Sequence, residues 1–255
     1  MIAHPSFTVE PWTVRETALD LDVLGQSESI FALANGHIGL RGNLDEGEPY
    51  GLPGTYLNSF YERRPLPHAE AGYGYPESGQ TIVNVTNGKI IRLLVDDEPF
   101  DIRYGEVRRH ERLLDLREGL LRRTVEWASP AGAAVRLRTT RLVSFAQRAT
   151  AAILYEVEPV DGPVRVVVQS ELVANEPTPA RTTDPRAAAA IRSSLARVRW
   201  TRTTRRSWSE NSSDSSGDSR AAAARGSLVR AGVGSLATSS DWTTTRTGPS
   251  TGSTS

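Results

Sequence analysis

The feature that most constrains this chain is an alternation of apolar and charged residues, at a period of two, through residues 82–173. Short turn signals separate the alternating runs, as in β proteins. Thr124–Trp127 and Val135–Thr139 are two such runs, and the turn-forming stretch Pro130–Gly132 between them predicts that they pair antiparallel. No run before residue 180 has a helical period, and so many strands need a second sheet over their apolar faces. The sequence therefore predicts an all-β antiparallel sandwich.

A tight hairpin is predicted at Asn87-Gly88, which stands between the apolar runs 82–85 and 90–95. Asn-Gly readily supplies the positive φ angles that a type I′ turn requires. We therefore expect these two runs to be neighbouring strands.

Two further strands are predicted on either side of the break at residues 161–163. Ile153, Tyr155 and Val157 have the spacing of side chains on one face of a strand. The run 164–168 is almost wholly apolar, which indicates burial on both faces.

Composition excludes several classes of protein. Lysine plus arginine total 30 and aspartate plus glutamate total 30, so net charge provides no attraction to nucleic acid or to an anionic membrane. The chain has no cysteine, which excludes disulfides and a cysteine nucleophile. No stretch of about 18 apolar residues and no secretory leader occur, so a cytoplasmic protein without a membrane partner is predicted.

The composition changes abruptly after Arg199 to serine, threonine, arginine, glycine and alanine. We therefore divide the chain into a β-sandwich domain over residues 1–199 and a low-complexity tail over 200–255. The tail is predicted to be disordered or to be read in a shifted frame, because it holds too few apolar residues for a core. Its residues are common products of GC-rich codons, and Lys89 is the one lysine among 30 basic residues. One short helix is predicted to begin at Asp184-Pro185.

The residues that could carry chemistry are sparse. The four histidines have none of the short spacings of metal-binding pairs, so no metal site is predicted; they are His4, His37, His68 and His110.

Asp45, Glu46 and Glu48 lie close together and in principle supply a general acid and base for glycoside cleavage. A purely structural role is favoured for them, because clustered carboxylates in a loop are common.

The most informative stretch is residues 28–43, E-S-I-F-A-L-A-N-G-H-I-G-L-R-G-N, followed by Glu46-Gly47 and by Pro53–Asn58. From the residues alone, it is a pair of apolar strands joined at Asn35-Gly36. Its glycines at positions 36, 39 and 42 are expected to serve turns and close strand approach. Arg41 is expected to pair with a buried carboxylate near Glu28 or Glu46.

This stretch resembles the amino-terminal domain of family 65 of the glycoside hydrolases, which includes maltose, trehalose and kojibiose phosphorylases. The chain departs from the family pattern at Ala34, His37 and Ser59. The resemblance implies a galactose-mutarotase-like β-supersandwich, followed in family members by a barrel of paired helices. It also implies the amino-terminal part of an enzyme that transfers glucose from an α-linked disaccharide to phosphate or water.

The resemblance assigns no catalytic residue to this chain, because the family's general acid and phosphate site lie in the barrel. The resemblance implies no cofactor, with inorganic phosphate as the co-substrate, and a disaccharide partner that binds through the barrel. The chain alone is expected to be inactive. Whether the chain forms homo-oligomers is left open. Seven residues match the family motif and are expected to hold the strand–turn geometry or to brace the domain against the barrel: Glu28, Asn35, Gly36, Arg41, Gly42, Asn43 and Glu46.

Two alternatives stay open at this point. The first is a free-standing sandwich that binds carbohydrate through exposed tyrosines, for which the candidates are Tyr50, Tyr56, Tyr73 and Tyr75. The second is an interaction domain that assembles with a separately encoded barrel.

Overall fold

The computed structural model describes residues 4–49, 51–66, 72–174, 199–206 and 229–233. These residues form one helix and fifteen strands, in the order β1 Phe7–Glu10, β2 Thr13–Glu16, α1 Leu24–Ile30, β3 Leu33–Ala34, β4 Ile38–Leu40, β5 Thr55–Pro65, β6 Ser78–Asn84, β7 Asn87–Val95, β8 Glu98–Pro99, β9 Glu106–Asp115, β10 Leu120–Ala128, β11 Ala134–Val143, β12 Ala151–Pro159, β13 Val166–Val173, β14 Arg199–Arg206 and β15 Val229–Val233.

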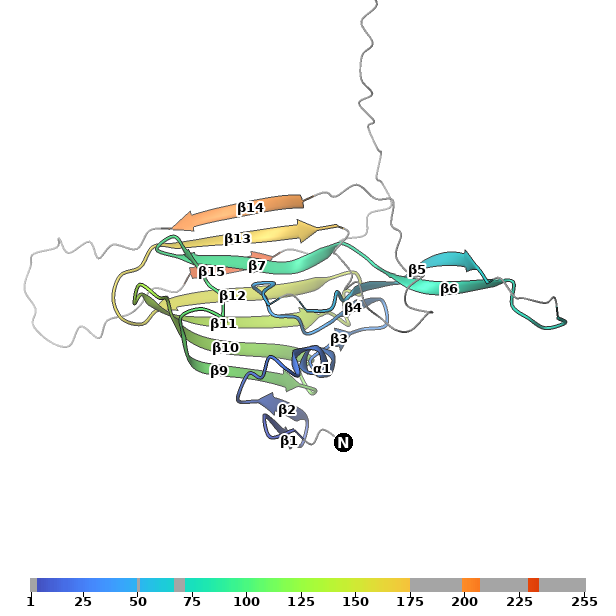
Figure 1. The fold of residues 1–255 in the computed structure, drawn as a ribbon, viewed down its shortest axis with the longest axis horizontal. Helices are drawn as coiled ribbons and strands as arrows, with labels where there is room; N and C mark the ends of the chain where they lie inside the picture. The colour runs from blue at the N-terminus through green and yellow to red at the C-terminus, as the bar shows by residue number, and fades with distance from the viewer. Residues whose placement is uncertain (1–3, 50, 67–71, 175–198, 207–228, 234–255) are drawn as a thin grey trace, which may run out of the picture.

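The strands form three antiparallel sheets. The largest has seven strands in the order β1-β2-β9-β10-β11-β12-β15, and a four-stranded sheet has the order β14-β13-β7-β8. The third sheet has the order β3-β4-β5-β6. Figure 1 shows β7, β13 and β14 as a layer over the large sheet, with β5 and β6 reaching away to one side. The predicted all-β antiparallel sandwich is confirmed.

The main core lies between the large sheet and the β7–β13 sheet. Ile153, Tyr155 and Val157 all face this core, as their spacing predicts. Val166, Val167 and Val168 are each buried, which confirms burial on both faces of β13. The other core residues come from β7, β10, β11 and β13, from the segments after β8 and before β13, and from α1 and the segment after β4 through Leu24 and Leu44.

A second, separate apolar cluster covers the other end of the large sheet. Phe31, Leu33 and Ile38, from the segment around β3 and β4, pack there with Leu114 of β9 and Leu121 of β10. The inner face of the large sheet is therefore covered by two different parts of the chain.

One of the two predicted hairpins is confirmed and one is wrong. Strands β10 and β11 pair from Leu120–Leu142 to Ala128–Ala134, as expected from the turn at 130–132. Strands β6 and β7 do not pair with each other, because β6 pairs with β5 while β7 pairs with β13 and β8. Asn87 is the first residue of β7, and its side-chain Oδ1 accepts a hydrogen bond from the Lys89 N–H at 2.9 Å. The Asn-Gly pair therefore stands where the chain crosses between sheets.

The helix α1 was missed from the sequence, which showed no helical period before residue 180. It has only seven residues, and its buried positions are Leu24, Ser27 and Glu28. Two of those three residues are polar, so the helix has no apolar stripe to recognise.

The tail was predicted to contain no packed element, yet two strands of it are described. Most of β14 and all of β15 follow residue 199; β14 pairs with β13, and β15 pairs with β12. The predicted helix at Asp184-Pro185 and the remaining tail lie outside the described residues, and the boundary at 199 stays a prediction. No helix within the described ranges is long and apolar enough to cross a membrane.

Gly105 provides a test of the packing before β9. Its φ is +76°, and an added Cβ would lie 2.3 Å from the Ala128 carbonyl oxygen and 2.9 Å from Trp127 Nε1. Gly119 has a similar φ of +67° with no atom within 4 Å of such a Cβ. Gly119→Ala should cost roughly 1–2 kcal/mol from backbone strain alone. Gly105→Ala should cost about 1–3 kcal/mol more from overpacking. Urea unfolding of both variants checks this, and equal losses would contradict the packing.

Candidate functional site

A row of buried polar side chains crosses the inner face of the large sheet. Its members stand directly opposite one another on neighbouring strands, in the order Glu16, Arg112, Arg123, Thr139 and Tyr155. Each is at most 4% exposed. We call these five residues the polar row.

On β10 and β11 the polar row lies between the two apolar clusters, whereas on β12 both Tyr155 and Ile153 belong to the main core. Val125 and Leu137 lie two positions from the row on one side, in the main core. Leu114 and Leu121 lie two positions from it on the other side, in the second cluster. Polar partners for the row must therefore come from a segment that enters the sandwich between the clusters.

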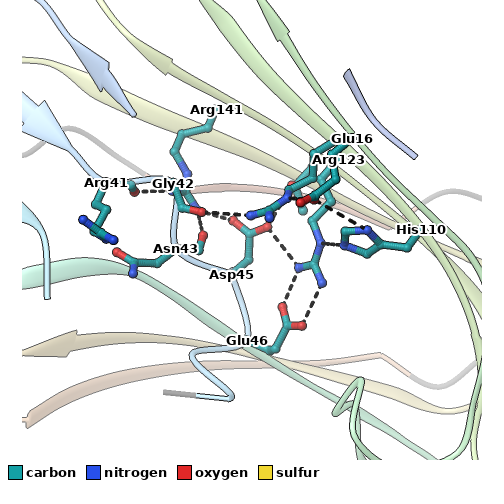
Figure 2. Close-up of polar contacts among 11 residues, drawn as sticks. Glu16, Arg41, Gly42, Asn43, Asp45, Glu46, His110, Arg123 and Arg141 are labelled. Carbon is teal, nitrogen blue, oxygen red and sulfur yellow. Dashed lines mark hydrogen bonds and ion pairs between the residues drawn. The ribbon is translucent and has the colours of Figure 1, made fainter. Parts of the chain in front are cut away.

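Residues 41–46, which follow β4, are that segment. Glu46 receives two hydrogen bonds from Arg123, from Nη1 to Oε2 at 2.5 Å and from Nη2 to Oε1 at 2.8 Å. The Gly42 carbonyl accepts a hydrogen bond from Arg112 Nη1 at 3.1 Å. Figure 2 shows Glu46 and Asp45 turned toward Arg123, with dashed lines for their contacts. The bidentate geometry fixes both the position and the orientation of Glu46.

Arg141 of β11 holds the other half of this segment. Its Nη2 donates to Asp45 Oδ1 at 2.6 Å and to the Asn43 carbonyl at 3.1 Å, and its Nη1 donates to the Arg41 carbonyl at 3.2 Å. Asp45 Oδ2 also accepts the Thr139 hydroxyl at 2.9 Å. Side chains of the large sheet thus add to the backbone contacts of the segment, which include a hydrogen bond from the Ile91 N–H of β7 to the Asp45 carbonyl at 2.7 Å.

Arg112 ties helix α1 to the same row. Its Nε donates to Glu16 Oε2 at 2.5 Å, and its Nη2 donates to the Ser27 hydroxyl. Ser27 in turn donates to Glu16 Oε1 at 2.5 Å, and the Arg112 guanidinium stands 4.8 Å from the centre of the Phe31 ring. The buried hydroxyl of Ser27 on α1 is therefore satisfied by the row.

The buried charges of this cluster balance, with three carboxylates and three guanidinium groups: Glu16, Asp45, Glu46, Arg112, Arg123 and Arg141. Burial opposes ionisation of Asp45, but Arg141 and Arg123 outweigh it and hold the pKa of this carboxyl below its ordinary value.

His110 lies beside the row in a neutral state. Burial, followed by the nearby guanidinium groups of Arg123 and Arg112, lowers the pKa of this imidazole to about 2. Its Nε2 accepts a hydrogen bond from Arg123 Nε at 3.4 Å.

This arrangement is unsuited to acid–base catalysis. Asp45 and Glu46 are each 2% exposed and bound by arginine, whereas a general acid needs access to substrate and a raised pKa. Glu48 is accessible, but it pairs with Arg103 at 3.3 Å. The structural interpretation of this acidic cluster therefore fits its surroundings better than the catalytic one.

Asn35 and Gly36 form the turn between β3 and β4. Asn35 Oδ1 accepts the backbone N–H groups of His37 and Ile38 at 2.9 and 2.8 Å. Its Nδ2 donates to the carbonyls of Ser144 and Arg148, at 2.6 and 2.9 Å. Gly36 has a φ of +80°, which confirms the predicted turn. This single side chain closes the turn and attaches it to the β11–β12 connection.

Gly42 permits a close approach of two backbones, as expected. A Cβ at this position would lie 2.6 Å from Phe31 Cβ and 2.7 Å from the Phe31 carbonyl oxygen. Its N–H donates to the Glu28 carbonyl at 2.8 Å.

Arg41 contacts Glu28, one of the two carboxylates expected for it, with 3.4 Å between Nε and Oε2. Its Nη2 also donates to the Gly25 carbonyl. Glu28 is 1% exposed, and Arg41 covers it from the outside with 18% of its side chain exposed. Asn43 Nδ2 donates to the Leu52 carbonyl at 2.9 Å. The motif residues thus hold local geometry, and their bracing of another domain stays a prediction.

The sequence assigned no site role to Glu16, Arg112, Arg123 or Arg141, although the three arginines stand in stretches that resemble the family. A signal was present, because the three arginines occupy inward positions of strands whose other inward residues are mostly apolar. An arginine in such a position needs a buried carboxylate. No group of potential metal ligands occurs in the part of the chain that the structure describes.

His110 predicts a pH dependence of stability. Since its pKa is about 2 when folded and near 6.5 when unfolded, the unfolded chain binds a proton that the folded chain excludes. Its contribution is complete above about pH 6.5 and is lost as the pH falls toward 2. The unfolding free energy should lose about 1.4 kcal/mol per pH unit from this group between pH 6 and 4.5. His110→Gln should remove that slope, measured by urea unfolding at several pH values, while His37→Gln should retain it.

Arg41 predicts a loss of stability on truncation. Arg41→Ala leaves the Glu28 carboxylate buried without its guanidinium, at an expected cost of about 2–3 kcal/mol. Arg138→Ala is a control, because Arg138 forms an ion pair with its side chain 45% exposed and should cost less than about 1 kcal/mol. A midpoint of urea unfolding for Arg41→Ala equal to that of the control would contradict a buried role.

Known proteins are similar to this chain in sequence and fold. An uncharacterized glycosyl hydrolase of Mycobacterium tuberculosis is 65% identical over 205 residues, which are 80% of this chain and 26% of the relative. The α,α-trehalose phosphorylase of Thermoanaerobacter brockii is 40% identical over 171 residues, which are 64% of this chain and 22% of the enzyme. The chain thus spans about a quarter of the length of the curated relatives it matches.

A solved structure from the human microbiome, assigned as a kojibiose phosphorylase, aligns with a TM-score of 0.61 at 29% identity. The alignment covers 68% of this chain and 23% of that protein. The family model described as glycosyl hydrolase family 65, N-terminal domain, matches residues 14–247. The match extends past Arg199, where the composition changes. The chain therefore belongs to glycosyl hydrolase family 65, as a representative of its N-terminal β-domain.

Proposed function

We propose that this chain is the N-terminal part of an enzyme that cleaves an α-linked glucose disaccharide and transfers the glucose to inorganic phosphate. The observation that carries the proposal is the family match over residues 14–247, together with 40% identity to a trehalose phosphorylase. Trehalose, maltose and kojibiose are the candidate substrates. Transfer to water is the competing reaction, and the two differ in their product.

The geometry of residues 41–46 supports a structural contribution of this domain to that enzyme. The acidic residues of the segment, Asp45 and Glu46, are ion-paired with Arg141 and Arg123, so their carboxylates hold the segment against the sheet. We propose that the proton donor and the phosphate site of the reaction are supplied outside this β-domain, and that this chain by itself is inactive.

A second candidate function is direct carbohydrate binding by the β-domain. Tyr73 and Tyr75 are 108% and 57% exposed, and aromatic faces of this kind stack against sugar rings. Tyr56 is half-buried in β5, and Tyr50 lies outside the described residues. Retention of the chain on immobilised α-glucan, lost in a Tyr73→Ala, Tyr75→Ala double variant, would favour this function.

Activity of the purified chain tests the proposal. With trehalose, maltose or kojibiose and inorganic phosphate, release of glucose 1-phosphate should equal a no-enzyme blank, because the described acidic segment has no free general acid. Release of free glucose should also equal the blank. A chimaera in which this β-domain replaces that of the T. brockii trehalose phosphorylase should phosphorolyse trehalose. Either product from the chain alone, or a folded chimaera without activity, would contradict the proposal.

A further inference from the structure

A small cavity lies beside the loop that leads from residues 41–46 to β5. Its volume is about 20 Å³, and its walls include Glu28 of α1, Asn43, and Lys89 and Ile90 of β7. Glu28 and Lys89 are 1% and 2% exposed, so the charged part of the wall lies inside the domain. A water molecule needs roughly 10–15 Å³ of such space. The cavity therefore has room for one water molecule and not for a sugar or a phosphate.

Asn43 brings an unpaired acceptor to this wall. Its Nδ2 donates to the Leu52 carbonyl at 2.9 Å, and this bond fixes which end of the amide is the oxygen. The oxygen, Oδ1, is buried and accepts no hydrogen bond from the part of the chain that the structure describes. A buried acceptor is costly to leave without a donor. The wall of the cavity therefore calls for a group that donates.

Glu28 has spare acceptor capacity in the same wall. An ionised carboxylate can accept about four hydrogen bonds. Within the described ranges Glu28 accepts one, from Arg41 Nε, and at 3.4 Å that bond is long. The backbone of Gly51 covers the carboxylate so closely that an added Cβ would stand 2.3 Å from Oε2. Any further donor to Glu28 must therefore be small.

The charges of the wall favour a neutral occupant. Among its described residues the wall has one carboxylate, Glu28, and one ammonium group, Lys89. A metal cation would need several oxygen ligands and would be repelled by Lys89. An anion would be repelled by Glu28. Water is neutral, donates two hydrogen bonds and is stable inside a protein when it has two to four polar partners.

We propose that this cavity binds one ordered water molecule, which donates hydrogen bonds to Asn43 Oδ1 and to the Glu28 carboxylate. The Lys89 ammonium in the same wall attracts the oxygen of this water. The bridge adds to the backbone contact between the Gly42 N–H and the Glu28 carbonyl at 2.8 Å, so α1 and residues 41–46 are joined twice. Glu28 and Asn43, two of the seven motif residues, thereby share one role. This inference is independent of the catalytic function proposed above.

Removal of the acceptor tests the site. Asn43→Leu keeps a side chain of similar size but offers no oxygen, so the water loses one of its two acceptors and should leave. Oxygen-17 magnetic relaxation dispersion of the full chain counts its long-lived internal waters. The count should fall by about one per molecule in Asn43→Leu. Asn58→Leu makes the same chemical change at an exposed position of β5 and should leave the count unchanged.

A second measurement locates the water. Ile90 lines the cavity, so its methyl protons should show a nuclear Overhauser effect to water in the parent and in Asn58→Leu. Asn43→Leu should lose this effect, with a far-UV circular dichroism spectrum equal to that of the parent. Should Asn43→Leu fail to fold, the effect at Ile90 in the parent decides alone. Equal water counts in the parent and a folded Asn43→Leu, or no effect at Ile90 in the parent, would overturn the proposal.

Discussion

The bidentate contact between Arg123 and Glu46 is the interaction on which the arrangement of this domain depends. Both side chains are almost fully buried, so each carries a desolvation cost that its partner must offset. The cost is met by geometry, since the carboxylate accepts two parallel hydrogen bonds and Asp45 stands 3.5 Å from the same guanidinium. An apolar pair could stabilise such a site as well, but it would allow residues 41–46 to lie in many positions on the large sheet. The Arg123–Glu46 pair allows one position.

Position matters here because two apolar clusters have to be assembled on one sheet. Apolar contacts are not directional, so neither the main core nor the cluster around Phe31 selects one arrangement of the residues that pack there. The polar row lies between them and requires specific partners, which residues 41–46 and Ser27 provide. A shift of the segment by one residue would leave buried guanidinium groups unpaired. The row therefore sets the register between the covering segments and the sheet.

Sequence reasoning recovered the parts of this fold whose causes are local. The pairing of β10 with β11, the inward face of β12 and the buried β13 all follow from period-two patterns and a nearby turn. It failed where distant contacts override local preference. Asn87-Gly88 has strong hairpin propensity, but β7, which begins at Asn87, pairs with β13. The Asn-Gly pair therefore lies where the chain crosses from one sheet to another. Helix α1 is polar on its buried side because Arg112 and Glu16 satisfy Ser27. The Arg41–Glu28 contact was expected from residue type, whereas the partner of Glu46 required knowledge of the strand register.

The anchored segment also helps to hold the start of β5, which with β6 reaches away from the sandwich in Figure 1. The chain leaves residues 41–46 and reaches β5 through Gly54, whose carbonyl accepts the Arg41 N–H at 2.8 Å. Lys89, buried on β7, donates through Nζ to the Gly54 carbonyl at 3.2 Å and to the Thr55 hydroxyl at 2.6 Å. The first residue of β5 is thus held by the same region that the polar row positions.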